Sequence, residues 1–335
     1  MNQTKLFNIK NKHSLVLEWA VQLNIKADQY SAKTLPEIIS NYKQELKNYF
    51  SLCALANSKN FETQIIGQAR NNAFQVRVAI EKGLAQTIQK SFGSDTSLLK
   101  ALGKGCFFGS SKKQGVSVRM PLVSCRPTKL CGNSCYAHNA LDADVQAVVR
   151  GVLNGLIANL FECGNHSVKE DVLTFLIPHS KKAINLARKE AKLSAPFFKR
   201  EPRIRFSHIG EITAYPEFAN AIAKQVQSLS CNEVKCIVYT RHPLAEKLDP
   251  NLWVVNFSLD ASSQDRRSWA PKSSRLVYST FGRELSKDAA VNFLEHHPHF
   301  HEKPKGDGVI CQATHPESMH RSCDKLACDF CFKKP

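Results

Sequence analysis

The first third of the chain has the apolar spacing of amphipathic helices. Apolar residues recur at intervals of three and four around 15–23, 35–50 and 65–88, which is the period of one buried helix face. Pro36 falls in the first turn of the second stretch, where its missing N–H does no harm. This part of the chain carries no catalytic signature. We therefore expect residues 1–95 to form a small helical accessory domain.

Beyond residue 95 the pattern changes to short apolar runs that alternate with helical stretches. Five glycines between Gly93 and Gly115 favour a linker, and a helical pattern then covers about 140–195. Candidate strands lie at 116–120, 204–209, 235–239, 252–259, 276–280 and 308–311, and candidate helices at 216–227 and 287–296. Such alternation is typical of parallel βα units. The sequence thus predicts an α/β fold, with residues 96–335 as a partial or open βα barrel.

Charged and sulfur side chains follow several of these expected strands. In parallel βα folds the carboxyl ends of the strands meet at one edge, where the chemistry is located. The residues concerned are, in chain order, Gly210, Glu211, Arg241, Asp260, Arg283 and Cys311. The four charged members of this set are candidate catalytic residues.

Seven of the twelve cysteines fall into two groups almost two hundred residues apart. The first group has the spacing Cys-x5-Cys-x3-Cys, and the second ends in Cys-x4-Cys-x2-Cys. Their members are Cys125, Cys131 and Cys135, then Cys311, Cys323, Cys328 and Cys331. Short spacings let several thiolates converge on one point, as zinc and iron–sulfur centres require. We therefore expect metal centres with cysteine ligands.

The number of ligands distinguishes the kinds of centre. Three cysteines leave one iron of a [4Fe–4S] cluster open for another ligand, whereas four close a structural or electron-carrying centre. The first group has three cysteines, with His138 as a possible fourth ligand, and the second group has four. Two separate centres, or one centre shared by both groups, remain alternatives, and so do iron–sulfur and zinc.

The chain is strongly basic, with a net charge of +17 and a pI near 9.4. Such an excess attracts polyanions, of which nucleic acid is the commonest. Candidate nucleic-acid-binding residues are Lys189, Lys192, Lys199 and Arg200. The same charges could also form one solvated helix face.

The chain has no apolar run long enough for a transmembrane helix, and its first residues lack the apolar core of a signal peptide. We therefore expect a cytoplasmic protein without a membrane partner. Thiols stay reduced in the cytoplasm, which favours metal ligation over disulfides for the clustered cysteines.

Two of these motifs resemble those of radical S-adenosylmethionine (SAM) enzymes. Those enzymes carry a three-cysteine [4Fe–4S] motif after the first strand of a partial βα barrel and a Gly-Glu motif after a later strand. Here Cys125, Cys131 and Cys135 match the first motif, with longer spacings than usual, and Gly210-Glu211 matches the second. The resemblance implies an open iron that chelates SAM.

The same resemblance assigns roles to the other candidate residues. Gly210 and Glu211 would hold the methionyl amine of SAM, and Arg241, Asp260 and Arg283 would line the cavity. Many radical SAM enzymes also carry a C-terminal cysteine-rich segment for an auxiliary cluster, as the second cysteine group would be.

Residues 105–335 are also similar to phage and mobile-element proteins of the "gene product 88-like" kind. That family has a Cys-x5/6-Cys-x3-Cys-Tyr-Ala element, a strand that ends in Gly-Asp/Glu, and a cysteine-rich C-terminus. Here these are Cys125 through Ala137, Gly210-Glu211, and Cys323 through Phe332. The similarity implies a related architecture and iron–sulfur content in a mobile-element context.

These observations lead to two hypotheses. In the first, the protein is a radical-SAM-like iron–sulfur enzyme that acts on or near nucleic acid. In the second, it is a non-catalytic DNA- or RNA-binding protein whose zinc or iron–sulfur centres are structural. An open coordination site at the first cysteine group would separate the two.

Overall fold

The protein divides into two compact units in the computed structural model. The structure describes residues 34–56, 63–93, 96–102, 107–111, 115–133, 135–138, 144–194, 201–280 and 285–293. The helical unit comprises residues 1–105, 121–123 and 131–157, and the sheet unit comprises 106–120, 124–130 and 158–335. Cys131 and Cys135 thus belong with the N-terminal helices, whereas the sequence placed them in a domain that begins at residue 96.

The helical unit begins with α2 (Leu35–Asn41) and α3 (Lys43–Ala56), followed by α4 (Thr63–Phe92) and α5 (Thr96–Leu102). Thr34 and Glu37 form a capping box that starts α2, with Pro36 in its first turn. The single helix expected at 35–50 is therefore two helices, broken at Tyr42. The side chain of Tyr42 is fully buried, and its hydroxyl lies 2.9 Å from that of Thr87.

Helix α4 presents one apolar stripe to this unit. Its buried apolar residues recur at helical spacing and are Ala69, Ala73, Val76, Ile80, Leu84 and Ile88. This confirms the helix expected at 65–88. The stretch expected at 15–23 lies outside the described residues.

The sheet unit contains a seven-stranded sheet whose strands follow one another in sequence order. Its strands are β1 (Phe108–Ser111), β2 (Gly115–Arg119), β3 (Arg203–Ile209), β4 (Lys235–Thr240), β5 (Trp253–Leu259), β6 (Arg275–Ser279) and β7 (Val291–Phe293). Strand β1 is antiparallel to β2, and every later neighbouring pair is parallel. The α/β class is confirmed. Within the described residues the sheet is open, with β1 and β7 at its edges.

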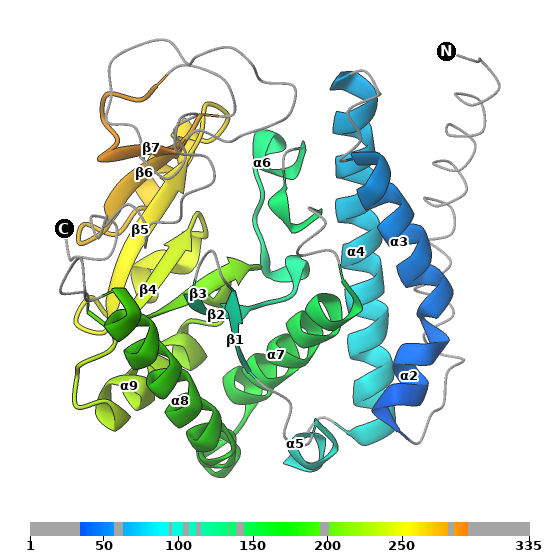
Figure 1. Cartoon of the computed structure of the whole chain (residues 1–335), viewed down its shortest axis with the longest axis vertical. Coiled ribbons are helices and arrows are strands. Elements are labelled where there is room, and N and C mark those ends of the chain that lie inside the picture. Colours follow the sequence, from blue (N-terminus) through cyan, green and yellow to red (C-terminus); the bar gives the residue numbers. More distant parts are fainter. Residues whose placement is uncertain are drawn as a thin grey trace. The chain divides into compact units, whose positions relative to one another are not determined.

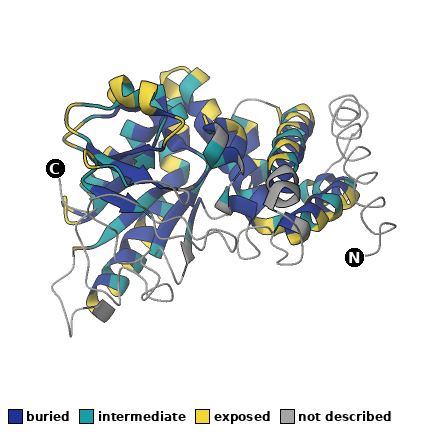
Figure 2. Cartoon of the chain, turned by 90° about the horizontal axis from the view of Figure 1, so that it is seen from above, coloured by how far each residue is buried: buried dark blue, intermediate teal, exposed yellow. Residues whose placement is uncertain are grey.

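Two helices cover one face of the sheet. Helix α8 (His166–Ser194) packs on β1 to β3, and α9 (Pro216–Leu229) packs on α8 and β4, as Figure 1 shows. Helix α7 (Val145–Cys163) precedes them, and the boundary between the units falls inside it. In Figure 2 most of the strands are dark blue, which marks the sheet as the buried core of this unit.

Successive side chains along a strand point to opposite faces of the sheet, and the two faces have different surroundings. Cys236, in register with Ile204, points its thiol at the carbonyl of Ala223 in α9, 4.0 Å away. Arg205 comes one residue after Ile204 and so lies on the opposite face. There its guanidinium stands 4.4 Å from the centre of the Tyr239 ring. One face is therefore apolar and covered by helices, and the other carries polar and aromatic groups.

Two elements differ from the sequence expectation. The glycine-rich stretch expected to be a linker includes the β1–β2 hairpin, with Gly109 in β1 and Gly115 in β2. The helix expected at 287–296 is wrong over its described part, because residues 291–293 form β7 and Val291 pairs with Val277 of β6. The strand expected at 308–311 lies outside the described residues. No helix in the described parts of the chain is both long and apolar enough to cross a membrane.

Candidate functional site

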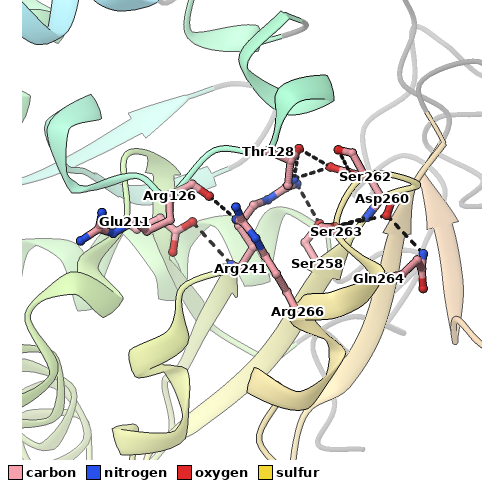
Figure 3. A network of polar contacts seen from close by, with 10 residues as sticks. All are labelled: Arg126, Thr128, Glu211, Arg241, Ser258, Asp260, Ser262, Ser263, Gln264 and Arg266. Carbon is pink, nitrogen blue, oxygen red and sulfur yellow. Dashed lines mark hydrogen bonds and ion pairs between the residues drawn. The ribbon is translucent and has the colours of Figure 1, made fainter.

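Three of the four charged residues singled out in the sequence lie together at the carboxyl ends of the parallel strands, here called the carboxyl edge of the sheet. Glu211, Arg241 and Asp260 follow the neighbouring strands β3, β4 and β5, and Figure 3 shows all three in one polar network. Parallel strands in sequence order place consecutive strand ends side by side, so this grouping follows from the topology. Arg283 lies outside the described residues.

Gly210 turns the chain at the end of β3. Its φ of +69° lies in the left-handed region that glycine adopts without strain. Directly after this turn, the backbone N–H of Glu211 donates to the Ser124 hydroxyl at 2.8 Å. The Gly-Glu element is thus fastened to the residue that immediately precedes Cys125.

The carboxylate of Glu211 is buried among neutral donors. It accepts a hydrogen bond from the Thr240 hydroxyl at 2.5 Å and a long one from the backbone N–H of Arg241 at 3.5 Å. Burial raises the pKa of Glu211, and Thr240 and Arg241 offset only part of that rise. Glu211 is therefore a buried acid whose charged form the surrounding protein only partly stabilises.

Asp260 has the opposite electrostatic setting. One carboxylate oxygen accepts from the Thr128 hydroxyl at 2.5 Å and from Arg241 Nη1 at 2.8 Å, and the other accepts from the N–H and the hydroxyl of Ser262. Burial alone would raise the pKa of Asp260, but these hydrogen bonds and the charge of Arg241 outweigh it and lower the pKa. All four acceptor positions of this carboxylate are occupied.

Arg241 connects the two acids along the edge. Its backbone N–H faces Glu211, while its guanidinium lies between Asp260, Thr128 and the Ser258 hydroxyl, which is 3.2 Å from Nη2. The side chain is only 11% exposed. Arg241 therefore holds a fixed position beside Glu211 and leaves little of its charge open to solvent.

The loop that carries Cys125 is tied to this edge at three points. Ser124 accepts from the backbone of Glu211. Thr128 donates to Asp260, and the carbonyl of Arg126 accepts from Arg266 at 2.6 Å, as Figure 3 shows. Pattern reading did not find Ser124, Thr128, Thr240 or Ser258. The signal available in the sequence was their small hydroxyl side chains next to strand ends.

Two further hydroxyls near the strand ends are buried and have no hydrogen-bond partner among the described residues. Thr213 follows Glu211 by two positions, and Thr280 comes directly after β6. A buried hydroxyl without a partner costs about 1–3 kcal/mol. Hydroxyls of this kind are ready to bind a polar ligand group.

His242 also follows β4 but has a structural role. Its Nδ1 accepts from the N–H of Leu244 at 3.2 Å and caps the short 3-10 turn that follows. Burial and the nearby charge of Arg126 lower the pKa of His242 to about 4. The imidazole is therefore neutral at physiological pH, as the acceptor role requires.

The cysteines of the first group are not joined in disulfides and are half-buried. Cys125 belongs to the sheet unit, and Cys131 and Cys135 belong to the helical unit. Burial raises the pKa of Cys135 to about 12, and the nearby Cys131 adds to that rise. Across the described residues no three Cys, His, Asp or Glu side chains already converge as a metal site. Cys311, Cys323, Cys328 and Cys331 lie outside those residues.

His138, the possible fourth ligand, is buried in the helical unit. Its Nδ1 lies 3.0 Å from the Tyr49 hydroxyl. Burial, with the charges of Arg77 and Arg70, lowers the pKa of His138 to about 3. The ring is therefore neutral, and Tyr49 holds its orientation.

Of the four candidate nucleic-acid-binding residues, Lys189 and Lys192 are described, and both are exposed on α8. Lys181 and Lys182 are exposed on the same helix, so its second half carries a row of solvent-facing lysines. Lys199 and Arg200 lie outside the described residues.

The chain was compared with known proteins at three levels. No family model, no curated protein and no solved structure matches it.

Proposed function

We propose that the protein is a radical-SAM-like iron–sulfur enzyme that acts on or near nucleic acid, in keeping with its resemblance to mobile-element proteins. The observation that carries this proposal is the order of motifs on the sheet. The cysteine loop follows β2, the first strand of the parallel series, and Gly210-Glu211 ends the neighbouring strand β3. A hydrogen bond from Glu211 to Ser124 then fixes the second motif beside the first.

The donor set suits an iron–sulfur cluster. In the proposal Cys125, Cys131 and Cys135 hold a [4Fe–4S] cluster, and the four C-terminal cysteines hold a second centre. The first three are not joined in disulfides, and cysteine thiolates are the usual ligands of such clusters. When bound, a cluster with an open iron supplies the electron that cleaves SAM. Zinc, the alternative metal, would give a closed structural site instead.

In the proposed enzyme the residues at the carboxyl edge have different roles. Glu211, a buried acid with few strong donors, is suited to bind the cationic amine of SAM, with Gly210 supplying the turn. Asp260 uses its acceptors on Arg241, Thr128 and Ser262, so its role is to hold Arg241 in place. Thr213 and Thr280 offer hydroxyls to a polar ligand group.

A partial barrel is the finer architecture that we propose for the sheet. A barrel requires neighbouring parallel strands in sequence order, as β2 to β7 are. It also requires a face without helices to line its interior. Arg205 with Tyr239, and Arg275 with Asn256 at 3.4 Å, supply polar contacts on that face. The same face also carries a small apolar cluster, in which Val277 and Val291 pack with Tyr239 and Phe293.

Nucleic acid is the proposed partner because of the net charge of +17 and the exposed lysines of α8. The same lysines also suit the second hypothesis, a non-catalytic DNA- or RNA-binding protein with structural metal centres. SAM cleavage separates the two.

The test uses anaerobically prepared, reduced protein with SAM, and the release of 5′-deoxyadenosine is measured. We expect Glu211→Gln to abolish release while leaving the iron content unchanged, because Glu211 holds the ligand and not the metal. Glu162→Gln is the matched control. Burial also raises the pKa of Glu162, but its carboxylate accepts from the N–H of Phe218 at the start of α9.

No release by wild-type protein with a full cluster would contradict the catalytic proposal and favour the binding protein. Equal release by wild type and Glu211→Gln would remove Glu211 from the SAM site.

A further inference from the structure

Helix α4 contains an ion pair that is almost completely buried. Arg77 Nε lies 2.9 Å from Glu81 Oε1, and the two side chains are 1% and 0% exposed. Both charges lost their hydration when the helical unit folded. Their mutual attraction repays that cost only if further hydrogen bonds are made.

Those further hydrogen bonds go to both flanks of the first cysteine group. Glu81 Oε2 accepts from the N–H of Val123 at 3.3 Å, and Arg77 Nη1 donates to the carbonyl of Ala137 at 3.3 Å. Val123 comes two residues before Cys125, and Ala137 comes two residues after Cys135. One ion pair thus contacts the chain just before and just after the cysteine loop, 123–137.

Tyr49 of α3 adds to the contacts at the second flank. Its hydroxyl receives a hydrogen bond from Arg77 Nη1 at 3.2 Å, and it lies 3.0 Å from His138 Nδ1. The ring of Phe74 meets the His138 ring edge-on. The turn after Cys135 is therefore held by side chains of both α3 and α4.

Stability alone does not account for this pair. Apolar residues of similar volume in place of a buried ion pair are often neutral or stabilising. Arg77 also keeps one nitrogen, Nη2, buried and without a hydrogen-bond partner within the described structure, which is a further cost. Apolar residues could not make the two hydrogen bonds to Val123 and Ala137.

We infer that Arg77, Glu81 and Tyr49 are positioning residues: they hold Val123 and Ala137 so that the thiols of Cys131 and Cys135, in the same unit, can bind a metal centre. The metal-binding part rests on the proposed function, whereas the positioning part does not. The N-terminal helices are then part of the cysteine site and not merely an accessory domain.

The test compares two double variants by hydrogen exchange of the metal-free protein. Arg77→Met with Glu81→Leu removes both charges and leaves the volume similar. Tyr42→Phe with Thr87→Val is the matched control, because it removes a different buried polar pair, between Tyr42 and Thr87 of the same helix α4. Loss of one hydrogen bond corresponds to about tenfold faster exchange, which we expect at Val123 in the first variant only.

Two further readouts extend the test. Alkylation of Cys131 and Cys135, followed by mass spectrometry, should be faster in the first variant than in the control. If the wild type contains iron, a chelator should remove it faster from the first variant. If it contains none, the proposed function fails, but the exchange and alkylation results still decide the positioning role.

Unchanged exchange at Val123 and unchanged alkylation in a folded first variant would overturn the inference. Equal increases in both variants would also overturn it, because they would show general loosening of the helical unit. If the first double variant does not fold, Tyr49→Phe replaces it, since it removes one hydroxyl. It should speed alkylation of Cys135, and a rate equal to wild type would overturn the inference.

Discussion

Two acidic residues at the carboxyl edge of the sheet differ sharply in environment although they share a neighbour. Asp260 has four hydrogen bonds and a lowered pKa, whereas Glu211 has two and a raised pKa. Their position after consecutive strands could be predicted from sequence, because apolar runs locate strand ends. Their difference could not, because it depends on burial and on contacts such as that of Asp260 with Thr128, which reaches the edge from a distant segment.

Asp260→Asn should destabilise the protein by about 3–5 kcal/mol at neutral pH, because it leaves Arg241 buried without its counter-charge. Urea unfolding measures this loss. Glu217→Gln is the control, since its ion pair with Lys169 is largely exposed and contributes only about 0–1 kcal/mol. Similar losses in the two variants would contradict the structural role given to Asp260.

The pH dependence follows from the direction of the shift. The folded-state pKa of Asp260 lies below its ordinary value of 3.8. Its contribution to stability is therefore complete above that ordinary value and is lost as the pH falls through the lower folded-state pKa. The stability difference between wild type and Asp260→Asn should thus stay constant near neutrality and shrink only in strong acid. A difference that shrinks near neutral pH would contradict the assignment.

At the scale of elements, the sequence predicted long helices and strands well and short strands poorly. Helices α4 and α9 and strands β3 to β6 have enough apolar repeats to be recognised from the sequence. The helical stretch expected at about 140–195 is two helices, α7 and α8. Strand β7 has three residues and owes its form to pairing with β6, and β1 lies in a glycine-rich stretch. The spacing of apolar residues within a short segment cannot reveal a strand that forms only because it pairs with another strand.

Helix α8 supplies a prediction about nucleic acid. Lys189→Glu with Lys192→Glu should weaken binding and flatten its salt dependence, because each lost phosphate contact lowers the slope by about 0.9 for duplex DNA. Fluorescence anisotropy over a range of salt concentrations measures this effect. Lys224→Glu with Lys247→Glu changes the net charge equally on other exposed lysines. Equal effects of the two pairs would show that net charge, and not α8, governs binding.

At the scale of the whole molecule, the first cysteine group is divided between the two units, with Cys125 in the sheet unit. The sequence separated a helical domain from an iron–sulfur domain at residue 95, because the apolar pattern changes there. The structure assigns Cys131 and Cys135 to the helical unit. The contacts from Glu81 to Val123 and from Arg77 to Ala137 join residues 42 and 60 positions apart. Local sequence patterns carry no information about such contacts.

Metal analysis of anaerobically purified protein tests the central claim most directly. We predict stoichiometric iron and acid-labile sulfide, and the share held by the first centre should be lost when Cys125, Cys131 and Cys135 are replaced by alanine. Replacing the exposed Cys163 and Cys231, which belong to neither group, should leave the content unchanged. Stoichiometric zinc without iron, or iron that survives the triple replacement in full, would contradict the account.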